Sequence, residues 1–227
     1  MNDDAIDAHG AKDAHAAKLR FSPEEIRLVT DASWILTKNS VMEKVVRMMA
    51  VLSEVYRGKW EESQIHAMDP GSPKISRGEN YQGLPWIMLD YPRIFGRDEV
   101  LAIRTMFWWG HSFIVTLHLK GRYRELCLPA LEKNAGRLEE AGFHIGITED
   151  EWRHEHALET YRPLAGAGDL ATGLPFLKLS AALPVDRWEE ATGTLAAWFT
   201  LLVRTLASYQ GDERGLSPGS SRAGSDL

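Results

Sequence analysis

The amino-acid sequence predicts an α+β fold, in which a curved antiparallel sheet is packed by helices and a long amphipathic helix closes the chain. Short apolar runs in the middle of the chain are joined by tight turns, and helical periodicity flanks them on both sides. Strands and helices do not alternate regularly, which argues against a parallel sheet. We expect a single domain over residues 21–210, between disordered polar tails at residues 1–20 and 211–227.

Two helices are expected before the strands. Ser22-Pro23-Glu24-Glu25 has the pattern of a capping box, with Ser22 as the N-cap, proline at the first helical position and Glu25 reaching back. Residues 39–57 place apolar side chains at helical spacing and predict a longer helix. Gly58 stands where a glycine cap would end it.

The central region predicts a strand and a hairpin. Residues 86–91 form a short apolar run, and residues 100–109 and 112–120 form two more, separated by Gly110-His111. A two-residue turn is therefore expected. With that turn, one face would carry Thr105, Phe107, Trp109, Ser112, Ile114, Thr116 and His118.

The remaining elements are a helix over residues 124–140, a strand over residues 176–183 and the final helix, for which Asp186 is the expected N-cap and Glu189 its reciprocal partner. Residues 148–163 allow either a helix, which begins at a capping box, or a strand with polar and aromatic residues on one face. The sequence leaves both possibilities open.

Composition and charge exclude several classes of protein. The net charge is −6 and the pI is about 5.8, and no block of five basic residues occurs, so a nucleic-acid partner is not expected. The amino-terminal residues have no apolar signal-peptide core, and the longest apolar run, residues 195–203, is too short to span a membrane. The single cysteine, Cys127, fits a reducing compartment and is expected to be a buried hydrophobe. A cytoplasmic location without membrane contact follows as the expectation.

No motif of a familiar enzyme class is present. The chain contains no glycine-rich dinucleotide or phosphate loop, no nucleophile elbow, no zinc-protease helix motif and no C-x-x-C pair. No cofactor is therefore predicted.

The first candidate site is the polar stretch of residues 75–86, which leads into a buried strand. Loops held by a rigid sheet often carry binding groups, and an arginine fork can clamp a carboxylate or phosphate. The alternative is a loop that stabilises only itself, with Arg77 bridging Glu79. The candidate ligand-binding residues of this stretch are Arg77, Glu79, Asn80, Tyr81 and Trp86.

The second candidate site is the hairpin. Arg104 stands inside an apolar strand, so a buried position would require a partner for its charge, and Asp90 is one possibility. Trp108 and Trp109 add large aromatic surfaces, which suit the floor of a binding pocket.

Histidines supply the candidate chemical groups. His111 or His118 could act as an acid or base, with Asp90 as the orienting carboxylate. His154 and His156 would point the same way on a strand and form a weak metal-site candidate, but on a helix they would diverge. A solvated charged segment is the preferred interpretation there, so no metal is predicted.

The leading hypothesis is a non-catalytic or accessory protein that binds a small ligand or a peptide partner on its sheet. The alternative is an enzyme that acts on a small polar or anionic metabolite through histidine acid–base chemistry. A third, weaker hypothesis is a structural subunit of a larger assembly, which would show an exposed apolar patch instead of a pocket.

Overall fold

A computed structural model describes residues 19–65 and 68–208. The tails that the sequence predicts to be disordered lie almost entirely outside these residues. The chain divides into two compact units, residues 1–44 and residues 45–227, which are described separately below. The helices and strands of the chain are α2 (Pro23–Thr30), α3 (Ala32–Glu62), β1 (Lys74–Tyr81), β2 (Leu84–Phe95), β3 (Val100–Trp108), β4 (Ser112–Lys120), α4 (Arg122–Lys133), α5 (Ala135–Glu140), β5 (His144–Gly146), β6 (Tyr161–Pro163), β7 (Phe176–Pro184) and α6 (Trp188–Ala207).

The first unit begins with the predicted capping box, which is confirmed. The Ser22 side chain accepts a hydrogen bond from the Glu25 backbone N–H (3.2 Å), and the Ser22 N–H donates to the Glu25 carboxylate (2.6 Å). Helix α2 then runs for eight residues, none of which is buried. Asp31 accepts a hydrogen bond from the Ser33 N–H (2.9 Å) where α3 begins.

Helix α3 is longer than the sequence predicts. It starts at Ala32 and continues through Gly58 to Glu62, so the expectation that Gly58 ends the helix was wrong. Two interactions beyond the glycine support the extra turn. The Trp60 side chain is buried, and Lys59 forms an ion pair with Glu62 at 2.7 Å.

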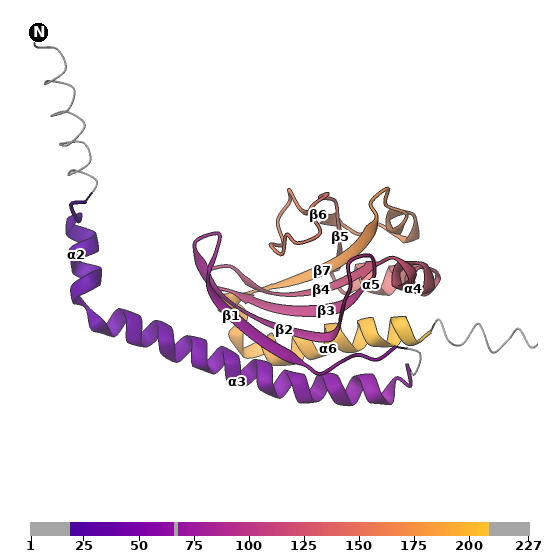
Figure 1. Ribbon diagram of the computed structural model, residues 1–227, viewed down its shortest axis with the longest axis horizontal. Coiled ribbons are helices and arrows are strands. Elements are labelled where there is room, and N and C mark those ends of the chain that lie inside the picture. The colour runs from indigo at the N-terminus through magenta and orange to yellow at the C-terminus, as the bar shows by residue number, and fades with distance from the viewer. Residues whose placement is uncertain (1–18, 66–67, 209–227) are drawn as a thin grey trace, which may run out of the picture. The chain divides into compact units, whose positions relative to one another are not determined.

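The second unit is built on an open seven-stranded sheet in the order β1-β2-β3-β4-β7-β5-β6, with every pair antiparallel. Figure 1 shows that the sheet is curved and that α6 lies along one of its faces. The predicted α+β class, the antiparallel sheet and the long C-terminal helix are therefore confirmed. None of the helices in the described part of the chain has the length and apolar character needed to cross a membrane.

The core lies between the sheet and α6. Tyr56 stacks on Phe199 with ring centroids 3.8 Å apart, and its hydroxyl lies 3.0 Å from Thr105 Oγ1. Strand residues that face α6 are almost all apolar and fully buried, as are Leu195 and Leu202 of the helix itself. This side therefore accounts for most of the apolar burial and leaves the opposite face of the sheet, here called the open face, for other groups.

Three local predictions were wrong. The β3–β4 connection contains residues 109–111, because Trp108 pairs with Ser112 and Gly110 adopts a positive φ of 74°. With three residues in the turn instead of two, Arg104, Met106 and Trp108 share a face with Thr116 and Ile114, and the predicted grouping of Thr105, Phe107 and Trp109 with that face was wrong. Asp186 does not cap α6. It lies in a 3-10 turn (Val185–Arg187), and the N-cap is Arg187, without a side-chain hydrogen bond.

Two further segments differ from the expectation. The helix predicted over residues 124–140 divides at Asn134, whose side-chain amide donates to the Ala130 carbonyl (2.8 Å), into α4 and α5. Residues 148–160 form turns and irregular backbone, and only Tyr161–Pro163 pairs as a strand. Most of residues 148–163 is therefore neither a helix nor a strand.

Candidate functional site

Polar residues form a continuous row across the open face. Asp90 pairs with Arg104, Arg104 with Thr116, Thr116 with Ser180, and Ser180 with His144, so the row crosses five neighbouring strands. Asp90, Thr116 and Ser180 are buried. Residues 147–160, here called the covering segment, contact this row from outside the sheet, as the side-chain hydrogen bonds below show. The open face thus carries a polar layer under a segment of irregular backbone.

The predicted pairing of Asp90 with Arg104 is present. Arg104 Nε donates to Asp90 Oδ1 at 2.7 Å, and Nη2 donates to Oδ2 at 3.4 Å. The remaining nitrogen, Nη1, lies 3.3 Å from His154 Nε2, and the Phe95 ring lies 5.3 Å from the guanidinium carbon. A shielded charge requires such partners, because an uncompensated ion away from water is strongly unfavourable.

A second buried cation, Lys178, joins β7 to the covering segment. Only 3% of Lys178 is exposed, and its ammonium group donates to the backbone carbonyls of Glu151 (3.1 Å) and Arg153. Burial, together with the nearby charge of Arg104, lowers the pKa of Lys178 to about 8. The lysine therefore holds irregular backbone in place by satisfying carbonyl groups that have no partner in a sheet.

His118 also lies under the covering segment, and it is neutral at pH 7. Burial, together with the charges of Lys178, Arg104 and Lys120, lowers the pKa of His118 to about 3. Its Nε2 lies 3.3 Å from the Glu151 carboxylate without forming a hydrogen bond of good geometry. Lys120 forms the ion pair with Glu151 (2.9 Å), so the imidazole does not need a charge to balance that carboxylate.

Tyr81 connects the tip of the β1–β2 hairpin to the covering segment. Its hydroxyl accepts a hydrogen bond from the His154 N–H (2.8 Å) and donates to the Glu155 carboxylate, which is itself paired with Arg153. Burial and the Glu155 hydrogen bond raise the pKa of Tyr81 to about 12. The phenol therefore stays protonated and available as a donor at neutral pH.

An apolar cluster occupies the part of the open face next to this hairpin. Its half-buried members include Trp86, whose indole lies over Gly78 so closely that a Cβ there would stand 2.6 Å from Trp86 Nε1. The Trp108 indole N–H donates to the Tyr81 carbonyl (3.2 Å), and the His111 ring stacks on Trp108 with centroids 3.7 Å apart. The cluster consists of Met88, Met106, Trp108 and Ile114, with Tyr81, Leu84, Trp86 and Ala182 packed against it.

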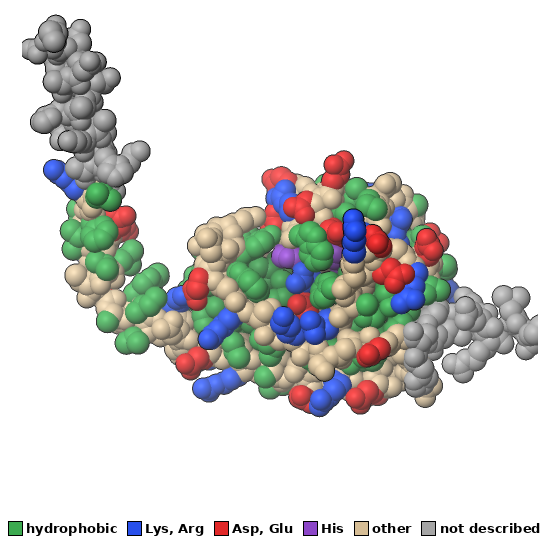
Figure 2. Space-filling model, in the orientation of Figure 1, with side chains coloured by type: hydrophobic (Ala, Val, Ile, Leu, Met, Phe, Trp, Pro, Cys, Tyr) green, Lys and Arg blue, Asp and Glu red, His purple; other side chains and the backbone are tan. Residues whose placement is uncertain are grey.

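Figure 2 shows the surface of this region. Hydrophobic side chains gather beside the hairpin, histidine side chains are visible in a hollow next to them, and lysine, arginine and acidic side chains lie below the hollow. The open face therefore combines an apolar area and a polar area that meet at Tyr81, which belongs to both.

The structure brings together some of the residues predicted for the site and separates others. Tyr81, Trp86, Arg104 and Trp108 gather on the open face, as the apolar cluster and the polar row show. The rest lie elsewhere. Arg77 and Glu79 are exposed on the edge strand β1, Asn80 accepts a hydrogen bond from the Gly83 N–H in the hairpin turn, and Trp109 lies against Phe107 on the helix side.

The predicted acid–base set is not assembled. Asp90 is engaged by Arg104 through both oxygens, so it does not orient an imidazole. His111 stacks on Trp108, whereas His118 lies seven residues along the chain beside Glu151. At about 3.4 Å per strand residue the two histidines lie roughly 20 Å apart, and Asp90 and His118 are separated by the strand that carries Arg104.

The two candidate metal ligands have different partners. His154 contacts Arg104, while His156 stacks on Tyr161 and lies 3.2 Å from the Ser180 hydroxyl. Among residues 19–65 and 68–208, no three His, Cys, Asp or Glu side chains converge in a way that could hold a metal ion.

Sequence reasoning missed Lys178, Glu151, Glu155 and Ser180. One signal was available, since Lys178 interrupts an apolar strand just as Arg104 does. The positions of Glu151, Glu155 and Ser180 could not be predicted, because they depend on the pairing of distant strands and on a segment without periodic structure. The chain matches no protein-family model, no curated protein and no solved structure.

Proposed function

We propose that this chain is a non-catalytic binding protein that holds a peptide partner or a small ligand on the open face of its sheet. The observation that carries the proposal is the half-buried aromatic cluster at the hairpin, directly beside a polar layer. Aromatic anchors next to satisfied polar groups are the usual composition of binding hot spots. Tyr81 and Trp86 supply surface for an apolar side chain of the ligand.

The polar layer supports binding better than catalysis. Asp90, Arg104, Glu155 and Lys178 each have protein partners that satisfy them, so they form a rigid wall and not a set of groups waiting for a substrate. A preorganised wall lowers the entropy that a ligand loses on binding. The enzyme alternative required Asp90 and a histidine to act together, and no observation favours it over binding.

Peptide selection from a displayed random library tests this proposal. Peptides selected on the intact chain should bind at least tenfold more weakly to Trp86→Ala, because the variant removes a half-buried aromatic surface. Trp109→Ala serves as the matched control, since its side chain lies against Phe107 on the other side of the sheet. Circular dichroism establishes that both variants fold. Equal binding by folded Trp86→Ala and Trp109→Ala would refute the proposal.

A second candidate function, a subunit of a homo-oligomer, is favoured by the surface of residues 19–36. Eight large apolar side chains of this stretch are between 46% and 73% exposed, and α2 has no buried residue. A helix of eight residues is not stable on its own in water. The exposed side chains are Leu19, Phe21, Ile26, Leu28, Val29, Trp34, Ile35 and Leu36.

A second copy of the same stretch is the partner that fits these residues. The apolar area, on the order of several hundred Å², is characteristic of interaction surfaces. Residues 19–38 carry three cations and three carboxylates, so two copies can meet without net repulsion. Analytical ultracentrifugation should show a dimer that becomes a monomer in Leu28→Glu/Val29→Glu but not in Ser40→Glu. A monomeric wild-type chain at all concentrations would exclude this candidate.

A further inference from the structure

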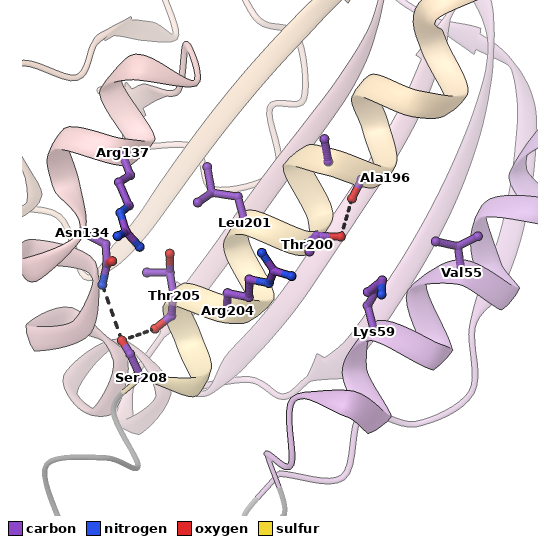
Figure 3. A pocket seen from close by; sticks show the side chains of 11 residues that line it. Val55, Lys59, Asn134, Arg137, Ala196, Thr200, Leu201, Arg204, Thr205 and Ser208 are labelled. Atoms are coloured by element: carbon purple, nitrogen blue, oxygen red, sulfur yellow. Dashed lines mark hydrogen bonds between the residues drawn. The ribbon is translucent and has the colours of Figure 1, made fainter.

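A cavity of about 490 Å³ lies on the helix side of the second unit, away from the open face. Figure 3 shows how it is framed by three elements: α3, the junction of α4 and α5, and the C-terminal half of α6. Its volume lies within the range of small-molecule binding sites. Its lining includes Val55, Lys59, Arg137, Ala197, Leu201 and Arg204.

Every ionisable side chain in this lining is a cation. Lys59 is already paired with Glu62 at 2.7 Å. For the guanidinium groups of Arg137 and Arg204, the described part of the chain supplies neither an ion pair nor a hydrogen bond. Both arginines are exposed to solvent, so their donors stay available, in a planar arrangement that suits a carboxylate or a phosphate.

The partial negative charges at the C-terminal ends of the helices balance part of the positive charge in the cavity, but not all of it. Lys59, Arg137 and Arg204 each lie in the last turn of their helix, where a cation interacts favourably with the helix dipole. A helix C-terminus carries only about half a negative charge. The two full charges of Arg137 and Arg204 exceed what the ends of α5 and α6 can balance, so the cavity stays attractive to an anion.

Three other polar side chains of the cavity, those of Thr200, Ser208 and Asn134, have protons engaged in hydrogen bonds. The Thr200 hydroxyl donates to the Ala196 carbonyl (2.7 Å), and the Ser208 hydroxyl donates to the Thr205 carbonyl (2.7 Å). The Asn134 amide donates to the Ala130 carbonyl (2.8 Å). Recognition of an anion therefore rests on the two arginines and not on these three groups.

The rest of the wall is apolar. Val55 of α3 lines the cavity, as do Ala197 and Leu201, which lie one helical turn apart on α6. A ligand that fits must combine a negative group with an apolar body. We infer that this cavity is a second binding site, which takes a small organic anion whose carboxylate or phosphate binds Arg137 and Arg204 while its apolar body lies against Val55 and Leu201.

Displacement of the fluorescent anion 8-anilinonaphthalene-1-sulfonate tests the inference on the full-length chain. Octanoate and octyl phosphate are the anionic competitors that distinguish the two head groups, inorganic phosphate tests the head group alone, and octanol tests the apolar body alone. Octanoate or octyl phosphate should displace the dye at a concentration at least tenfold lower than inorganic phosphate or octanol requires.

Variants place the site. Arg137→Gln/Arg204→Gln should weaken binding of the preferred anion at least tenfold, whereas Arg97→Gln, which changes an exposed arginine outside the cavity, should leave it unchanged. Ala197→Phe should also abolish binding by filling the cavity, and circular dichroism verifies that each variant is folded. Octanol competing as well as octanoate, or a folded double variant that binds like wild type, would overturn the inference. Because Trp86→Ala leaves this cavity intact, failure here and failure on the open face are distinguishable.

Discussion

Asp90 and Arg104 face each other directly across the β2–β3 ladder, and the two oxygens of the carboxylate meet two nitrogens of the guanidinium at 2.7 and 3.4 Å. Only 7% of the Asp90 side chain and 15% of the Arg104 side chain are exposed. The third nitrogen of Arg104 reaches His154. One ion pair thus neutralises two shielded charges and joins the sheet to the covering segment.

Removing one member of this pair should be more harmful than removing both. Asp90→Asn leaves the Arg104 charge without its counter-ion and should lower the free energy of unfolding by about 3–5 kcal/mol. Asp90→Leu/Arg104→Met should recover much of that loss. Urea denaturation measures each value. Glu190→Gln, which disrupts the exposed pair with Arg187, should cost less than about 1 kcal/mol, and equal losses at the two pairs would contradict the prediction.

Stability should fall as the pH drops from 6.5. The pKa values of His118 and His154 are lowered to about 3 and that of His156 to about 4, mainly by burial, while the unfolded chain titrates near 6.5. Below pH 6.5 the unfolded state therefore binds more protons than the native state, and stability is lost progressively toward pH 3.

Urea denaturation between pH 7 and pH 5, above the range where most carboxylates protonate, measures this effect. Below pH 6 the contribution of His118 to the slope should approach about 1.4 kcal/mol per pH unit. His118→Gln cannot gain a proton, so its slope should be smaller by that amount, whereas His111→Gln, at the exposed turn, is the control. An identical slope in His118→Gln and wild type would show that His118 titrates normally.

Two glycines should respond to alanine in opposite directions. At Gly78 a Cβ would stand 2.6–2.8 Å from the Trp86 indole, so Gly78→Ala must displace that ring and should destabilise the chain by about 1–3 kcal/mol. At Gly58, inside α3, a Cβ meets no atom within 4 Å, and Gly58→Ala should stabilise by about 0.5–1 kcal/mol. Thermal denaturation of both variants checks the signs.

Cys127 should not react in the native state. The thiol is fully buried in α4, and burial raises its pKa to about 12, so almost no thiolate forms at neutral pH. Ellman's reagent should label it only as fast as the chain unfolds, and complete labelling in urea provides the control. Rapid labelling of the folded chain would show that α4 opens locally.

The parts of the fold that the sequence predicts correctly depend on local patterns. The capping box at Ser22, the apolar period of the final helix and the buried position of Cys127 can each be inferred from neighbouring residues. The Asp90–Arg104 pair could also be predicted from the sequence, because a charge inside an apolar strand requires a nearby counter-charge.

The arrangement of the site depends on quantities that local patterns do not contain. A single additional residue in the β3–β4 turn placed Trp108, and not Trp109, on the open face. The row from Asp90 to His144 requires the register of five strands at once. The covering segment has no period to detect, since side chains from the sheet hold it.

The bonds that hold the covering segment have a consequence for the order of folding. They include those of Tyr81, Arg104, Lys120 and Lys178, which belong to β1, β3, β4 and β7, so the segment acquires its partners only after strands distant along the chain have assembled. Contacts between distant residues form late, because the entropy of closing long loops must be lost first. The segment should therefore order last when the chain refolds, and its amide hydrogens should exchange with solvent before those of β3 and β4.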